Sequence, residues 1–244
     1  MYLGRLRSPL FLCLYTGMKT FIIYNKSLPE TVTNATDCLS SFDHYSGWEP
    51  ELFDGCTPET LDDYIAQYNV TQGIRTKFKT DHKLWKSKFA CFYSHYALWV
   101  KCSELDTPIA IIENDTRCIR NFDISFDHSS NSVIQITLES MINPLKGVQP
   151  HIKRGRLKEY EDIGEGIHDI WFEHPHGHVY LAGATGYIIT PKAAQVLIKD
   201  CISNGWTQND LLISNNDMEL LYVNPSPIEY VKAKEKKTSS KVYK

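Results

Sequence analysis

The sequence lacks the long apolar run that a membrane-spanning helix requires. No stretch of its 244 residues approaches the roughly 18–20 consecutive apolar residues that cross a bilayer. Its seven cysteines are an odd number, scattered along the chain with no C-x-x-C pair. This pattern argues against a zinc ribbon or a disulfide framework and favours reduced thiols. We therefore expect a cytoplasmic protein.

Two catalytic signatures are missing as well. The sequence has no G-x-G-x-x-G dinucleotide fingerprint and no G-x-S-x-G nucleophile elbow. Ser94 and His95 do not form a nucleophile pair, because neighbouring residues on a helix do not face one another. These absences argue against a dinucleotide-binding enzyme and against a serine hydrolase.

The composition is that of a globular protein, with 42% apolar and 23% charged residues. The net charge of −3 hides an asymmetry, because residues 232–244 hold six Lys and one Glu and so carry +5 against −8 elsewhere. We expect an N-terminal extension at 1–17, one folded domain at 18–230 and a Lys-rich flexible tail at 231–244. Arg5 and Arg7 precede a short apolar run, so a weak signal peptide is the alternative for the extension.

The stretch from Phe89 to Asp115 is the centre of the prediction. Aromatic residues spaced three and four apart share one face of a predicted helix: Phe89, Phe92, Tyr96 and Trp99. Pro108 blocks further helix. The apolar run 109–112 then predicts a strand that is buried on both faces of an α/β sheet. Further strands are predicted at 20–24 and 51–54, and a helix begins at Pro191 with Thr190 as its cap.

The predicted buried strand ends in an acidic triplet, Glu113-Asn114-Asp115. In open α/β sheets, ligands bind at the carboxyl ends of the strands. The first and third side chains of the triplet point the same way, and two carboxylates together suit a hard cation such as Mg²⁺ or Mn²⁺. The alternative is an ordinary polar turn after a strand.

Three other clusters have a functional and an ordinary interpretation. Four histidines have a spacing that resembles metal ligands, but they lie in a predicted loop where surface histidines are common: His168, His174, His176 and His178. The turn 183–186 (GATG) has small residues that let a ligand approach the backbone, or simply joins two strands. Basic residues at 153–158 and in the tail suit a polyanion, or are solvated surface.

Several segments resemble glycosyltransferase family 25, the lipopolysaccharide and collagen glycosyltransferase-like group. FACFYSHYALWVKC is similar to a helix of that family, PIAIIEND to its strand with an acidic triplet, and GATGYIITPKAAQVLI to a later segment. ELFDGCTPETL is similar in place and character to the stretch before the helix. The resemblance covers roughly residues 20–227, and the three main matches occur in order.

The resemblance implies a GT-A-like fold, an α/β nucleotide-binding sandwich with a mixed, mostly parallel central sheet. It implies a nucleotide-sugar donor, UDP-linked by expectation, and a Mn²⁺ or Mg²⁺ ion. Asp115 and Glu113 match the outer acids of the family triplet and are the expected metal ligands, whereas Asn114 replaces the middle acid. The segments of the resemblance assign to the donor site Glu113, Asn114, Ser94, His95, Gly183 and Tyr187. The first strand lacks the family's basic motif and continues instead as Tyr24-Asn25-Lys26-Ser27.

An inverting transfer needs a base that removes the proton of the acceptor hydroxyl. The resemblance points to an acid after the later helix, which selects Asp210 and keeps Asp217 in reserve. Either residue is also explained as a helix cap.

Two acceptors and one non-catalytic alternative follow from the resemblance. The altered triplet resembles those of members from tailed bacteriophages, some of which place sugars on modified DNA bases in the host cytoplasm. Bacterial lipooligosaccharide is the competing acceptor, and the sugar moved is a hexose or a pentose. The alternative is a sugar- or DNA-binding protein on a decayed transferase fold, for which Asn114 is the best support.

Overall fold

The computed structural model describes residues 17–71, 85–137, 165–169, 181, 183–214 and 216–231. The predicted extension and tail lie outside these ranges apart from Gly17 and Val231. The basic cluster at 153–158 and three of the four clustered histidines also lie outside the described residues. His168 is described, and its ring packs against that of Tyr222 with 5.4 Å between the centroids.

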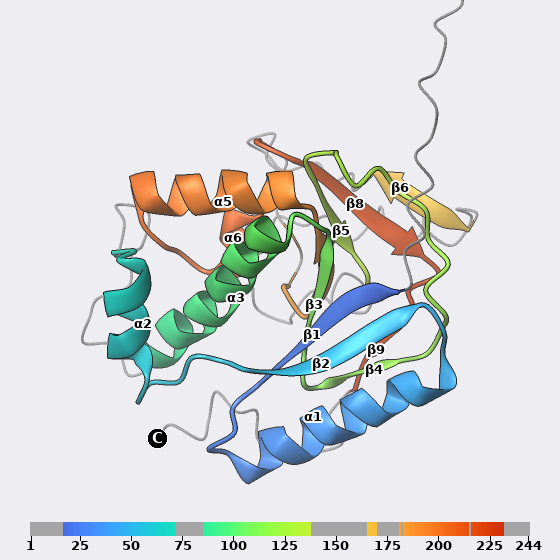
Figure 1. Ribbon diagram of the computed structural model, residues 1–244, viewed down its shortest axis with the longest axis horizontal. Helices are drawn as coiled ribbons and strands as arrows, with labels where there is room; N and C mark the ends of the chain where they lie inside the picture. The colour runs from blue at the N-terminus through green and yellow to red at the C-terminus, as the bar shows by residue number, and fades with distance from the viewer. Residues whose placement is uncertain are drawn as a thin grey trace, which may run out of the picture.

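The fold is built on a central seven-stranded sheet, which Figure 1 shows between two sets of helices. The strand order is β2-β1-β3-β7-β5-β8-β6. The strands are β1 (Met18–Tyr24), β2 (Trp48–Asp54), β3 (Ile109–Glu113), β5 (Ser132–Gln135), β6 (Gly166–Asp169), β7 (Gly186–Ile189) and β8 (Glu219–Asn224). Strands β2, β1 and β3 are parallel neighbours, and β7 and β6 run against the rest. The predicted α/β fold with a mixed, mostly parallel sheet is confirmed.

Helices cover both faces of the sheet. The helices are α1 (Pro29–Ser41), a 3₁₀ turn η1 (Phe42–His44), α2 (Leu61–Tyr68), α3 (Trp85–Leu105), α5 (Pro191–Asn204) and α6 (Asn209–Leu212). Helices α3 and α5 pack together on one face, whereas α1 lies on the other face with a two-stranded ribbon (Figure 1). The ribbon pairs β4 (Thr116–Cys118) with β9 (Ile228–Tyr230).

Strand β3 is buried between these two layers, as its apolar run predicts. Ile109 and Ile111 belong to the core beneath α3 and α5, and Ala110 and Ile112 to the core beneath α1. All four are fully buried. The alternation of side chains along a strand therefore supplies both cores from one continuous run.

Helix α3 is buried around most of its circumference. The predicted aromatic face is buried, and so are residues between its members, including Ser94, His95 and Leu98. Phe89 stacks on Trp206 with a centroid separation of 4.3 Å. The helix is therefore a central packing element that also carries polar side chains to the interior.

The predicted helix at Pro191 is confirmed, because Thr190 caps α5 and its hydroxyl accepts from the Ala193 amide. The strands predicted at 20–24 and 51–54 begin earlier in the structure, at Met18 and Trp48, and β2 contains Pro50 as an edge strand can. Helix α1 begins at Pro29, where proline suits the first turn. In the described ranges, no helix is both long and apolar enough to cross a membrane.

Candidate active site

The candidate site lies where the parallel strands β2, β1 and β3 end. In the sheet register, Tyr24 is opposite Asp54 and Ile23 is opposite Glu113. The loops that leave these three strands therefore start from one edge of the sheet, the edge formed by the carboxyl ends of its parallel strands. This is the edge at which open α/β sheets bind ligands.

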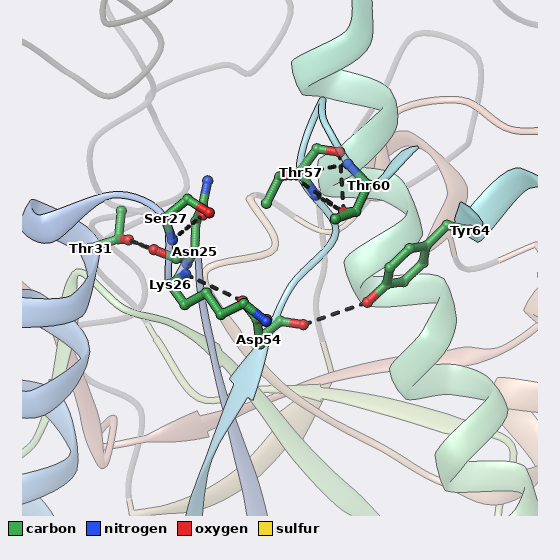
Figure 2. Close-up of polar contacts among 8 residues, drawn as sticks. All are labelled: Asn25, Lys26, Ser27, Thr31, Asp54, Thr57, Thr60 and Tyr64. Atoms are coloured by element: carbon green, nitrogen blue, oxygen red, sulfur yellow. Dashed lines mark hydrogen bonds and ion pairs between the residues drawn. The ribbon is translucent and has the colours of Figure 1, made fainter. Parts of the chain in front are cut away.

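The loops after β1 and β2 are joined by an ion pair that Figure 2 shows. The Lys26 ammonium lies 2.6 Å from the Asp54 carboxylate, and the Lys26 amide donates to the same side chain. This pairing raises the pKa of Lys26 through its hydrogen bond to Asp54. Thr57 supports the second loop, because its hydroxyl accepts from the amides of Glu59 and Thr60. The edge therefore presents one cation and one carboxylate at neighbouring strand ends.

Asn114 ties the acidic triplet to strand β1. Its side-chain amide donates to the Ile23 carbonyl across 3.1 Å. A carboxylate at this position has no proton to donate to a carbonyl. The departure from the family's middle acid thus has a structural role in this chain.

Asp115 is half-buried beside a second carboxylate. Burial is the main cause that raises the pKa of Asp115 to about 7, and the charge of Glu113 raises it further, against a hydrogen bond from Tyr230. Its Oδ1 atom is buried and has no hydrogen-bond partner in the described part of the chain. Two carboxylates that repel one another, one with an unsatisfied oxygen, are an arrangement that a divalent cation relieves.

Helix α3 adds a thiol and an imidazole beside Glu113. Cys91 and His95 are four residues apart and so lie on one face of the helix. One ligand atom each of Cys91, His95 and Glu113 lie within 4.8 Å of one another. His95 Nε2 is 3.9 Å from Glu113 Oε1, which is within ion-pair range but too long for a hydrogen bond.

Ser94 holds the loop that follows β2. Its hydroxyl accepts from the Cys56 amide at 2.9 Å and donates to the Ala90 carbonyl at 3.0 Å. Gly55 is required beside it, because an added Cβ would lie 2.8 Å from Ser94 Oγ and 3.0 Å from a methyl group of Ile23. Ser94 therefore fixes the path of the loop that begins directly after Asp54.

His95 is oriented from behind by two aromatic residues. Its Nδ1 lies 2.9 Å from the Tyr187 hydroxyl, which also accepts from Trp99 Nε1 at 2.9 Å. Ser94, His95 and Tyr187 are at most 3% exposed. The family resemblance assigns these three residues to the donor site, and that assignment stays a prediction; their burial suits side chains that support the loops from behind.

The two candidate bases occupy opposite edges of the sheet. Asp210, on α6, has a raised pKa mainly because it is buried, with Lys88 and His95 lowering it and Glu113 raising it. Asn209, the neighbour of Asp210, donates to the Cys91 carbonyl at 3.5 Å, which places the start of α6 beside the part of α3 that faces Glu113. Asp217 precedes β8, whose first residue pairs with Ser132 at the start of β5, so it lies at the other edge. The structure thus brings Asp210 into the candidate site and leaves Asp217 out of it.

The residues present fit a hard divalent cation. Asp115 and Glu113 supply oxygen ligands, and Asp115 Oδ1 is a buried acceptor without a partner in the ranges that the structure describes. Gly183 and the turn around it lie alongside, because the Glu113 amide donates to the Thr185 carbonyl. Gly183 has a φ of +80°, a conformation that favours glycine.

Sequence reasoning missed Asp54, Cys91 and Tyr230 as members of this edge. Asp54 ends a predicted strand, as Glu113 does, but it was not selected because no second acidic residue lies beside it in the sequence. Cys91 lies one helical turn before His95, so the spacing was visible in the sequence. Tyr230 is brought to Asp115 by the β4–β9 pairing, which no local pattern predicts.

A family model described as glycosyltransferase family 25 (LPS biosynthesis protein) matches residues 33–213, well over half of the chain. The chain belongs to glycosyltransferase family 25. This confirms the family resemblance and the glycosyltransferase class that the sequence predicts. The matched span of the family 25 model includes Asp54, the acidic triplet and Asp210.

No curated protein matches this family 25 chain. Among solved structures, the chain is similar to the apo form of mouse xyloside xylosyltransferase 1, with a TM-score of 0.43 and 10% identity. That similarity covers 81% of this chain and 80% of the mouse chain.

Proposed function

We propose that this chain moves a hexose or a pentose from a nucleotide-sugar donor to an acceptor hydroxyl, with inversion at the anomeric carbon. The observation that carries the proposal is the position of the start of α6 near Glu113. Asn209, the neighbour of Asp210, donates to the Cys91 carbonyl at 3.5 Å, and a ligand atom of Cys91 lies within 4.8 Å of one of Glu113. Asp210 and Glu113 are 97 positions apart in the sequence, and the charge of Glu113 raises the pKa of Asp210. A metal-binding acid and a separate base are the two groups that a cation-assisted inverting transfer requires.

The donor nucleoside binds over the ends of β1 and β2 in this proposal. Acidic side chains at such strand ends bind ribose hydroxyls in open α/β sheets, which suits Asp54. Lys26 is paired with Asp54 and is mostly exposed, so it is free to turn toward a phosphate when a donor arrives. UDP-linked sugars are the first donors to test.

Asp115 and Glu113 would hold Mn²⁺ or Mg²⁺ at the end of β3. Such a cation neutralises the diphosphate and stabilises it as a leaving group. Asn114 keeps the turn in place through its bond to Ile23. Within this arrangement the middle residue of the triplet has a structural task, and the charge comes from the two outer acids.

Asp210 acts as the general base. The acceptor oxygen attacks the anomeric carbon, the bond from that carbon to the diphosphate oxygen breaks, and the hydroxyl proton passes to the Asp210 carboxylate. Burial raises the pKa of Asp210, which strengthens it as a base, while Lys88 and His95 favour its ionised form. Asp217 takes no part, because it lies at the other edge of the sheet.

The proposal is tested by incubating the full chain with a panel of nucleotide sugars and analysing candidate acceptors by mass spectrometry. We expect a mass increase of one sugar residue, lost in Asp115→Asn and in Asp210→Asn and kept in Asp217→Asn. Donor binding is measured in parallel by calorimetry, with and without Mn²⁺. A chain that binds sugars or DNA but transfers nothing under any donor would support the non-catalytic alternative.

The acceptor is an anionic surface, and two classes compete. The description of the family favours lipooligosaccharide. The basic residues at 153–158 and in the tail favour an anionic partner of either kind. A DNA enzyme should bind duplex with steep salt dependence and modify its bases, whereas a lipooligosaccharide enzyme should modify glycan and ignore duplex.

A further inference from the structure

Cys91, His95 and Glu113 form a cluster whose chemistry differs from that of the acidic triplet. Their ligand atoms lie within 4.8 Å of one another, and they offer a thiol, an imidazole and a carboxylate. Hard cations such as Mg²⁺ prefer oxygen alone, whereas sulfur and imidazole nitrogen suit Zn²⁺. The cluster is therefore unsuited to the donor cation and needs a separate explanation.

Cys91 is exposed as a residue, unlike the other cysteines that the structure describes, but burial of its sulfur and the charges of Glu113 and Asp210 raise the pKa of its thiol to about 12. Cys38, Cys56, Cys102, Cys118 and Cys201 are all buried, as cysteines used for packing commonly are. Cys91 stands one helical turn from His95 on the same face of α3. Core packing does not account for a thiol in this position.

Both α3 ligands have an outer partner of the kind that metal ligands use. His95 Nδ1 is held by the Tyr187 hydroxyl, which leaves Nε2 directed toward Glu113. The side-chain amide of Asn209 lies 3.8 Å from Cys91 Sγ, where it donates to sulfur. Asn209 is only 6% exposed, and its Oδ1 has no hydrogen-bond partner among the described residues. A buried amide held against an exposed cysteine is a second, independent sign of a built site.

We propose that Cys91, His95 and Glu113 bind Zn²⁺, with a fourth position open to water or substrate. Three protein ligands and one open position are the usual set for zinc that is not purely structural. The Cys91 thiol gives up its proton to solvent when the metal binds. His95 then coordinates through Nε2 while Nδ1 donates to Tyr187.

The shared ligand gives this zinc site a regulatory consequence. Glu113 belongs both to the zinc cluster and to the proposed Mn²⁺ or Mg²⁺ site, so it cannot serve both cations fully. Zn²⁺ therefore inhibits transfer by competing for Glu113. The inhibition rests on the proposed function, whereas the binding of zinc does not.

Co²⁺ is the probe that tests the site, because a thiolate bound to Co²⁺ gives a ligand-to-metal charge-transfer band in the near ultraviolet. The full chain is titrated with Co²⁺ without any donor, in wild type, Cys91→Ser, Asp115→Asn and Cys102→Ser. Cys102 is the matched control, because it lies on the same helix about three turns from Cys91. We expect the band in wild type, Asp115→Asn and Cys102→Ser, and its loss in Cys91→Ser. Zn²⁺ should then displace Co²⁺ and remove the band.

A second measurement uses transfer activity. Zn²⁺ should inhibit the wild type, and Cys91→Ser should require about 10- to 100-fold more Zn²⁺ for the same fractional inhibition, measured against the activity of each protein without zinc. The zinc site is overturned if wild type shows no band, or if Cys91→Ser keeps it. A band without any transferase activity would instead overturn the proposed function and leave the zinc site standing.

Discussion

The Asn114 side chain and the Ile23 carbonyl form a hydrogen bond of 3.1 Å that joins the acidic turn after β3 to strand β1. We expect Asn114→Asp to destabilise the metal-free protein, although it restores the middle acid of the family pattern. The new carboxylate would face a carbonyl oxygen and add a third negative charge beside Glu113 and Asp115. The cost should be about 1–3 kcal/mol in the free energy of unfolding, measured by denaturant titration in EDTA.

Asn121→Asp is the matched control for that change. The side-chain oxygen of Asn121 accepts from the Ser46 amide at 2.9 Å, and an aspartate can keep this bond. Asn121 is also exposed. Its replacement should leave stability within about 0.5 kcal/mol of wild type. Equal effects of the two substitutions would contradict a specific role for the Asn114 amide.

Asp115→Asn should stabilise the metal-free protein at alkaline pH while abolishing transfer. Burial, with help from Glu113, raises the pKa of Asp115 to about 7, against about 3.9 in an unfolded chain. Between these values the folded state holds a proton that the unfolded state has lost, so wild-type stability falls as pH rises from about 4 to about 7. Above pH 7 the folded protein carries the full free-energy cost of an ionised Asp115 beside Glu113, and the Asn variant avoids this cost.

The measurement is denaturant unfolding in EDTA at pH 5 and at pH 8, with the exposed Asp123→Asn as control. The Asp115→Asn variant should be more stable than wild type at pH 8 by roughly 1–3 kcal/mol, with a smaller gap at pH 5. Added Mn²⁺ should restore stability to wild type and not to the variant. If the stability difference between Asp115→Asn and wild type grew as the pH fell, the pKa of Asp115 would not be raised in the folded protein.

Features that depend on neighbouring residues could be predicted from the sequence, and features that depend on residues far apart in the chain could not. Strand β3 was predictable because it is buried on both faces, and a run of four apolar residues records this directly. Glu113 and Asp115 were predictable because they end that strand. The roles of Ser94, His95 and Tyr187 were not, because their partners lie far away in sequence, as in the Tyr187–Trp99 bond.

The short strands β4 and β9 show a second limit. Each has three residues, too few for periodicity to be visible, and they pair across more than a hundred positions. This pairing brings Tyr230 to Asp115 and so shapes the proposed metal site at the end of β3. The sequence ranked Asp210 above Asp217 only through the resemblance, because it is the sheet topology that separates the two edges.

Ser94→Ala should weaken donor binding through the loop after β2. The change leaves the buried Cys56 amide without its acceptor, at a cost of about 1–3 kcal/mol. Because that loop directly follows Asp54, we expect KM for the donor to rise several-fold with a smaller change in kcat. Steady-state kinetics over a range of donor concentrations separates the two constants. Ser103→Ala, on the same helix, is the control, and an unchanged KM in Ser94→Ala would argue against the positioning role.

Asp210→Asn and Asp217→Asn should differ sharply in kcat. Loss of the base should lower kcat by about 10²–10⁴-fold in Asp210→Asn, whereas Asp217→Asn should stay near wild type. Donor affinity, measured by calorimetry, should be kept in both. Since burial raises the pKa of Asp210, the acidic limb of the wild-type pH profile should fall at a higher pH than an ordinary aspartate would give. An equal loss of kcat in the two variants would contradict the role of Asp210 as the general base.

The Lys-rich tail should strengthen binding to an anionic acceptor. The Val231 amide donates to the Asp115 carbonyl at 2.8 Å, so residues 232–244 follow directly from a residue bound to the acidic turn. Replacing the six tail lysines by Gln should weaken acceptor binding and flatten its salt dependence, by about 0.9 in slope for each phosphate of duplex DNA that is no longer neutralised. Replacing the same six by Arg keeps the charge and should keep both. Titration of duplex DNA and of lipooligosaccharide at several salt concentrations measures the affinity of each protein and its salt dependence. The better candidate for the acceptor is the ligand whose affinity falls in the Gln variant and is kept in the Arg variant. Equal affinities of all three proteins for both ligands would show that the tail takes no part in acceptor binding.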